Sequence, residues 1–174
     1  DAGPAAQSSR SELVSAALRV PVDRDAIERD VWRCLAAVAD PEIPVVSIVD
    51  LGIVRHVRVG ERGDVEVGLT PTYSGCPATS VIRADVERAL HGGGHRALRL
   101  VDGLAPPWTT DWISAEGRRK LATYGIAPPS PGPVGWPYCG SSATVLLSEF
   151  GSTPCKALHR CESCREPFDY FKCH

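Results

Sequence analysis

Four of the seven cysteines lie in the last 24 residues, which read GSTPCKALHRCESCREPFDYFKCH. Cys161 and Cys164 form a C-x-x-C pair, a spacing that lets one tight turn point two sulfur atoms at an ion about 2.3 Å away. A segment this short cannot bury enough apolar surface to fold alone, and a structural zinc ion contributes on the order of 10 kcal/mol to such folding. We therefore expect a small, metal-bound, zinc-ribbon-like domain over residues 138–174.

The first turn of this ribbon lacks one of the two cysteines that a zinc ribbon needs there. A zinc ribbon needs two such turns, and the other one is predicted around Cys139. Trp136 stands three residues before it, where the partner thiolate is expected. The candidate ligands are Cys139, Cys155, Cys161 and Cys164, with Cys173 as the alternative fourth ligand and His174 as a more remote one. An iron–sulfur cluster and disulfides remain alternatives, although the odd number of five tail cysteines argues against a purely disulfide framework.

The segment before the tail predicts a compact α+β domain over residues 23–126. A helix capped by Asp23 or Asp25 is followed by a hairpin of two strands within 53–60 and 64–70. A helix from about Ala78 and a shorter strand within 95–103 come next. A last helix is expected to start at Thr110 or Asp111. The order indicates a small mixed or antiparallel sheet with helices on one face.

Two segments flank this domain. Residues 1–22 are expected to be a flexible N-terminus with a short helix after Ser11. Residues 127–137 contain five prolines, so they predict a semi-rigid linker.

The charge of the chain narrows the class of partner. A net charge of -2 provides no electrostatic reason to bind nucleic acid or an anionic membrane. No apolar run approaches the ~18–20 residues that span a bilayer, and residues 1–10 show no export signal. We therefore expect a cytoplasmic protein, in which clustered cysteines more often bind metal or react than form disulfides.

Cys76, in TPTYSGCPATSV, is the most notable cysteine outside the tail. It precedes Pro77 at the predicted start of a helix, where unpaired amides and the helix dipole favour a thiolate. A nucleophile or a transient metal ligand would suit this place, and an inert buried cysteine is the alternative. Asp40, Glu42 and Asp50 either shape turns or flank this thiol and share in metal handling.

The motifs DPEIPVVSIVDLGIVR and LTPTYSGCPAT resemble the iron–sulfur-assembly domain of SufT and of the eukaryotic cytosolic iron–sulfur targeting factor. With the ending SEFGSTPCKALHRCESCREPFDYFKCH, the chain from about residue 25 onward is similar to the PaaD (PaaJ) family of bacterial phenylacetate degradation. One departure is that the family's ribbon opens Cys-Pro-x-Cys, whereas Trp136 opens this one.

The resemblance implies an accessory subunit of the phenylacetyl-CoA 1,2-epoxidase system. Such a subunit would assemble or deliver iron–sulfur clusters for the complex or its iron–sulfur reductase, with Cys76 as a transient ligand for iron or a cluster. The sequence holds neither paired Glu-x-x-His motifs nor a G-x-G-x-x-G fingerprint, so neither oxygen nor hydride chemistry is expected here. Two alternatives stay open: an enzyme using Cys76 in thioester or CoA chemistry, and a ribbon that binds another protein. Homodimerisation is also left open. Phe168, Tyr170 and Phe171 either form a contact surface or fill the small core.

Overall fold

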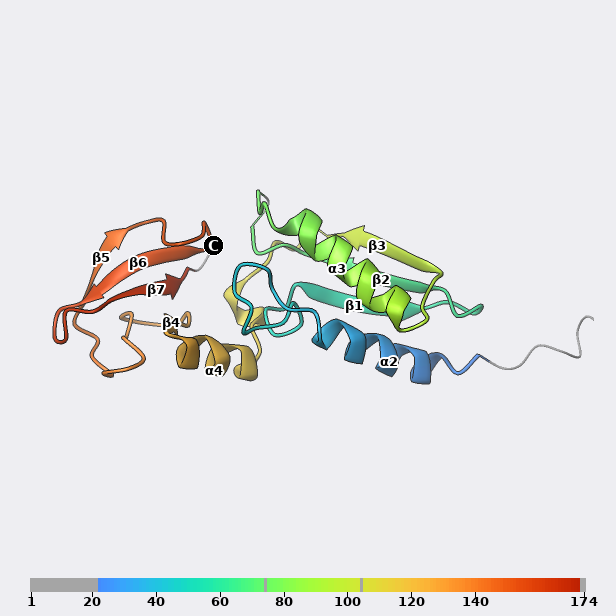
Figure 1. Cartoon of the computed structure of the whole chain (residues 1–174), viewed down its shortest axis with the longest axis horizontal. Helices are drawn as coiled ribbons and strands as arrows, with labels where there is room; N and C mark the ends of the chain where they lie inside the picture. Colours follow the sequence, from blue (N-terminus) through green and yellow to red (C-terminus); the bar gives the residue numbers. More distant parts are fainter. Residues whose placement is uncertain (1–21, 74, 104, 173–174) are drawn as a thin grey trace, which may run out of the picture.

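The computed structural model describes residues 22–73, 75–103 and 105–172. The helix expected after Ser11, and Cys173 and His174, lie outside these residues. The described part contains three α-helices and two β-sheets, so the predicted α+β class is confirmed (Figure 1). Among the residues described, no helix combines the length and apolar character needed to cross a bilayer.

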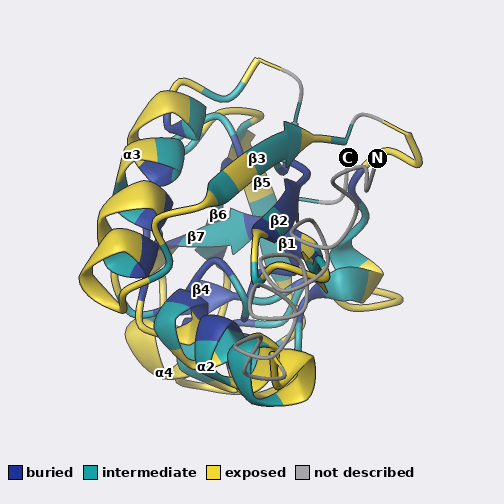
Figure 2. Cartoon of the chain, turned by 90° about the vertical axis from the view of Figure 1, so that its right-hand side faces the viewer, coloured by how far each residue is buried: buried dark blue, intermediate teal, exposed yellow. Residues whose placement is uncertain are grey.

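The first sheet has the order β1-β2-β3 and is mixed. β1 (Val54–Val59) and β2 (Val65–Leu69) form the predicted antiparallel hairpin, and β3 (Leu98–Asp102) pairs with β2 in parallel. The helices α2 (Arg24–Ala36) and α3 (Thr79–Gly92) contact each other and turn their buried sides toward the strands (Figure 2). Their apolar residues form one core with the strand residues Val65, Val67 and Leu69.

The face of the sheet opposite this core is polar. The carboxylate of Glu66 accepts hydrogen bonds from His56, Arg58 and Arg99 on the neighbouring strands. The pattern in β1 differs from simple alternation, because a bulge between Val54 and His56 shifts the register. Val54 and Val57 are therefore both buried, although alternation places them on opposite faces.

The last predicted helix is divided into two elements. A 3-10 turn, η1 (Thr110–Trp112), is capped by Thr109, and α4 (Ala115–Tyr124) is capped by Ser114, whose Oγ accepts from Gly117 N at 2.9 Å. The expectation that Thr110 or Asp111 caps one continuous helix is wrong. Ile113 has an extended backbone, so the chain cannot continue helically between the two elements.

The second sheet has the order β4-β7-β6-β5. β5 (Thr144–Ser148), β6 (Lys156–Cys161) and β7 (Pro167–Phe171) form an antiparallel tail sheet, and β4 (Ile126–Ala127) adds to β7 in parallel. β4 spans the domain boundary predicted at residue 127. In Figure 1, α4 and β4 accordingly lie beside the tail strands.

The tail contributes to two cores. Ala127, Trp136, Cys161 and Phe168 form a small separate cluster, whereas Cys155 and Phe171 belong to the main core. Phe171 is fully buried, with its ring 5.9 Å from that of Trp108. Phe168 is also buried, so the idea that this residue and Phe171 form an exposed contact surface is wrong. The tail is thus anchored to the first domain by its own side chains.

Candidate functional site: a thiol–carboxylate pocket and a three-cysteine cluster

Three of the predicted ribbon ligands converge. The ligand atoms of Cys139, Cys161 and Cys164 all lie within 4.8 Å of one another, and the sulfur atoms of Cys139 and Cys161 are 3.5 Å apart. The backbone N–H of Cys164 points at the Cys161 sulfur and, against the effect of burial, lowers the pKa of that thiol to about 7. A cluster of three thiols with donors oriented toward one sulfur suits zinc.

The position where a fourth thiolate was expected, three residues before Cys139, holds the apolar side chain of Trp136. Trp136 is buried and stacks on Phe168 with ring centroids 4.6 Å apart. Its backbone still forms the expected turn, since Gly140 N donates to Trp136 O at 2.9 Å and Trp136 N donates to Ser141 O at 3.0 Å. The residues described therefore fit a zinc ion with three thiolates, Cys139, Cys161 and Cys164.

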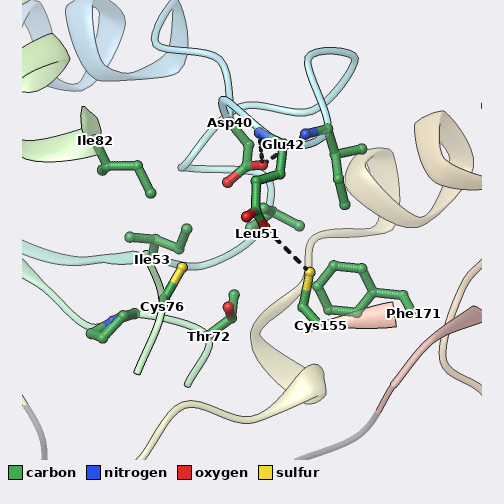
Figure 3. Close-up of a pocket in the computed structure, with 11 residues that line it drawn as sticks. Asp40, Glu42, Leu51, Ile53, Thr72, Cys76, Ile82, Cys155 and Phe171 are labelled. Atoms are coloured by element: carbon green, nitrogen blue, oxygen red, sulfur yellow. Dashed lines mark hydrogen bonds between the residues drawn. The ribbon is translucent and has the colours of Figure 1, made fainter. Parts of the chain in front are cut away.

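The structure does not bring Cys155 to this cluster. Cys155 lies in the turn before β6 and lines a pocket on the main core, together with Cys76, Asp40 and Glu42 (Figure 3). The pocket is narrow, with a volume of about 10 Å³, which is roughly one water-sized site. Apolar side chains close most of its wall: Ile43, Leu51, Ile53, Pro71, Ile82 and Phe171.

The Asp40 turn holds the acidic side of the pocket. Asp40 Oδ1 accepts from the backbone N–H groups of Glu42 at 2.9 Å and Ile43 at 2.8 Å, so the Asp-Pro-Glu motif folds into a tight turn. Burial raises the pKa of the Asp40 carboxyl, although the two N–H donors oppose this shift. The carboxylate of Glu42 extends across the pocket to the Cys155 sulfur, with 3.7 Å between Oε2 and Sγ.

Cys76 lies just before α3, where Thr79 Oγ1 donates to Cys76 O at 2.9 Å. Burial raises the pKa of the Cys76 thiol, and the charge of Glu42 adds to this, while the backbone N–H of Ala78 opposes it. The helix end acts in the predicted direction through the Ala78 N–H, but burial outweighs it and the net shift of the Cys76 pKa is upward. Two carboxyl groups beside the thiol favour its protonated form, and a bound cation would reverse that preference.

Cys155 has a similar environment. Burial raises the pKa of its thiol to about 11, and Glu42 adds to the shift. Thr153 Oγ1 lies 3.1 Å from the sulfur, and the neighbouring Lys156 is buried with its Nζ 3.5 Å from Asp169 Oδ2. The pocket thus gathers two thiols and two carboxyl groups, a donor set suited to a metal cation.

Asp50 does not line this pocket. Its carboxylate accepts from Ser47 N at 3.0 Å and from Lys120 Nζ at 2.7 Å, and its backbone carbonyl accepts from Ser114 N at 2.8 Å. Burial tends to raise the pKa of Asp50, but the hydrogen bonds from Lys120 and Ser47 outweigh it and lower the pKa. Asp50 therefore ties the loop before β1 to α4. The expectation that Asp50 flanks Cys76 together with Asp40 and Glu42 is wrong, because its carboxylate is turned to Lys120, 70 residues away in the chain.

One further set of three potential ligands lies among the described residues. Asp30, Cys34 and His95 have ligand atoms within 4.8 Å of one another, and His95 Nε2 is 2.9 Å from Asp30 Oδ2. The ion pair links α2 to the turn after α3. Cys34 is half-buried beside it.

Comparison with known proteins separates the chain into two matched parts. Residues 28–95 match the model of a family described as iron–sulfur cluster assembly protein, and residues 130–172 match the PaaD zinc beta ribbon domain. Cys76, Asp40 and Glu42 lie in the first part. Cys155 and the three-cysteine cluster lie in the second.

Several relatives extend these matches. A protein of Escherichia coli (strain K12), named as one of the subunits of 1,2-phenylacetyl-CoA epoxidase, is 49% identical over 152 residues, covering 83% of this chain and 92% of its own. An Fe-S protein maturation auxiliary factor of Porphyromonas gingivalis is 37% identical over 95 residues, covering 54% of this chain and 90% of its own. A solved structure from Bacillus anthracis, a domain of unknown function DUF59, has a TM-score of 0.53 at 30% identity and covers 56% of this chain and 93% of its own. This chain belongs to the PaaD family, in which an iron–sulfur-assembly domain precedes a zinc ribbon.

Proposed function

We propose that this protein is an accessory subunit of a phenylacetyl-CoA 1,2-epoxidase system and that it delivers iron or an iron–sulfur cluster to a component of that system. The observation that carries the proposal is the pocket in which Cys76 lies beside Asp40 and Glu42. The name of the Escherichia coli relative supports the epoxidase system, and the maturation-factor relative supports the iron–sulfur task.

The chemistry of the pocket suits a cargo that is held briefly. The Cys76 thiol is protonated when the pocket contains no cation, since burial and Glu42 raise its pKa. An arriving iron ion displaces the thiol proton to solvent, and the Glu42 carboxylate is placed to balance the charge of the ion. Loss of the cargo restores the protonated thiol, so uptake and release need no change in the fold.

The tail has a different task in this proposal. Zinc, when bound, fixes the turns that carry Cys139, Cys161 and Cys164, and the ordered tail docks on a component of the system. We propose the iron–sulfur reductase as the component on which the tail docks. We further propose that the protein acts in the cytoplasm. Homodimerisation remains a hypothesis. A role of Cys76 in thioester chemistry has less support, because burial raises the pKa of the Cys76 thiol and so disfavours the thiolate that such chemistry needs.

The test is maturation of the system in cells that carry Cys76→Ser. We expect the reductase purified from these cells to contain less iron and sulfide per chain, and epoxidase activity to fall in proportion. Cys34→Ser is the matched control, because Cys34 is a half-buried cysteine outside the pocket. Normal cluster content and activity with Cys76→Ser would contradict the proposal.

A further inference from the structure

We infer that Cys155, from the tail, is a second cargo ligand beside Cys76, so that iron or a cluster binds between the two sheets. This inference rests on the iron-handling function proposed above. We call the pocket lined by Cys76, Asp40, Glu42 and Cys155 the cargo pocket. In this inference the zinc-binding tail does more than dock on a partner, because it also supplies a thiolate to this pocket.

The geometry places the two thiols on one pocket. Cys76 approaches from the start of α3 and Cys155 from the turn before β6, and Figure 3 shows both sulfur atoms directed toward the acidic residues between them. Glu42 extends toward Cys155, with 3.7 Å between its Oε2 and the sulfur, although 113 residues separate the two in the chain. The contact therefore depends on how the tail sits on the first domain.

The surroundings of Cys155 are those of a ligand more than of a core cysteine. A structural cysteine normally lies among apolar groups, where its thiol is inert. Cys155 is only 5% exposed, yet it faces the Glu42 carboxylate and Thr153 Oγ1. The carboxyl group of Asp40, which is buried, lines the same pocket. A buried carboxyl group and a half-buried one beside two thiols favour a bound cation, which would offset the cost of burying the Asp40 charge.

The donor set indicates the class of cargo. Thiolates are the ligands of iron–sulfur clusters and bind iron readily, while carboxylates supply exchangeable positions for a client's own ligands. Binding of one Fe²⁺ by both cysteines forms two Fe–S bonds and releases two thiol protons to solvent, with no change in oxidation state. Among the residues described, the four donors do not converge as tightly as the three ribbon thiols, so side-chain rotations within the same fold would bring them to one ion.

Cobalt(II) provides a direct count of the thiolates, because each thiolate bound to the ion adds to its ligand-to-metal charge-transfer absorbance. The experiment uses the full chain with the ribbon first saturated by one equivalent of zinc, and it titrates Co²⁺ without oxygen. We expect Cys76→Ser and Cys155→Ser each to remove about half of the absorbance per bound cobalt and to weaken binding at least tenfold. All proteins in this comparison carry Cys34→Ser, because Cys34 belongs to the Asp30–Cys34–His95 set and would otherwise add its own thiolate to the signal. That background serves as the wild type for both variants.

The outcomes separate this inference from the function on which it rests. If Cys76→Ser lowers the absorbance while Cys155→Ser matches the wild type, the second ligand is refuted and the proposed function stands. If neither variant has an effect, both fail.

A second measurement needs no variant, so it remains valid if Cys155→Ser fails to fold. In the wild-type protein, bound Co²⁺ is expected to slow alkylation of Cys76 and of Cys155 together, as followed by peptide mass spectrometry. The alkylation rate of Cys34 is followed as well, and protection of Cys34 in place of the other two would put the ion at the Asp30–Cys34–His95 set and overturn the inference. Protection of Cys76 alone would overturn the inference.

Discussion

Gly117 lets helix α4 lie directly on the Asp50 turn. A Cβ atom at this position would lie 2.8 Å from Asp50 O and 3.1 Å from Asp50 Cβ, closer than packed atoms allow. We predict that Gly117→Ala lowers the free energy of unfolding by about 1–3 kcal/mol, because the added methyl group forces the helix away from the turn. Urea unfolding followed by circular dichroism measures the change.

Gly92→Ala is the matched control for Gly117→Ala. Gly92 is also the glycine of a helix, the last residue of α3, but a Cβ there would meet no atom within 4 Å. Alanine should leave stability unchanged or raise it by up to about 1 kcal/mol, because it favours helix. An equal gain in the two variants would mean that helix propensity, and not contact with Asp50, determines the result.

Individual site residues could be predicted from the sequence only where their partners are near in the chain. Asp40 and Glu42 lie in one motif, and the hypothesis that they flank Cys76 agrees with the pocket they line together. Asp50 and Cys155 could not be placed, since their partners Lys120 and Glu42 are 70 and 113 residues away. Residue type and local spacing indicate a ligand, but tertiary structure decides which site it joins.

At the scale of elements, hydrophobic periodicity predicted the helices and strands of the first domain. Val31 and Leu35 mark the buried side of α2, and their spacing is visible in the sequence. The prediction failed where a local polar contact decides the structure, as at Ser114, which starts α4 in the middle of an expected helix. Strand β4 was missed because two residues carry no periodic signal.

The tail sheet is the element most dependent on metal. Its separate core contains four buried residues, Ala127, Trp136, Cys161 and Phe168, so its apolar surface alone supports little stability. We predict that removing zinc with a chelator speeds amide hydrogen exchange in β5 and in the turns at 136–141 and 161–166 by at least tenfold. Exchange in the β1–β2 hairpin should stay as slow as before.

Two variants link that result to the metal. Cys164→Ser removes an exposed ligand from the cluster and should reproduce the fast exchange without chelator, with less than one zinc bound per chain. Cys34→Ser should retain both the zinc and the slow exchange. Slow exchange of the tail turns in zinc-free protein would show that Trp136 and its neighbours hold the tail without metal.

Over the whole molecule, the cargo pocket and the zinc cluster lie at different places on the same tail. Cys155 and Phe171 join the main core, whereas Cys161 and Phe168 belong to the separate one. A zinc ion at the three-cysteine cluster would therefore organise the outer end of the tail sheet, and the pocket lies where the inner end meets the first domain. A tail that docks on a client component is thus connected, through β6, to the residue proposed to hold the cargo.

This arrangement predicts that cargo stabilises both sheets together. A ligand bound only by the folded state adds about 2.7 kcal/mol at a concentration of one hundred times its dissociation constant. With Co²⁺ as the cargo at that excess and zinc in the ribbon, the slowest amides of β2 and of β6 should both gain protection of about this size. With Cys155→Ser at the same saturation, β2 keeps its gain and β6 loses it. Protection of β6 that persists in the variant would mean that the tail takes no part in holding the cargo, even if Cys76 does.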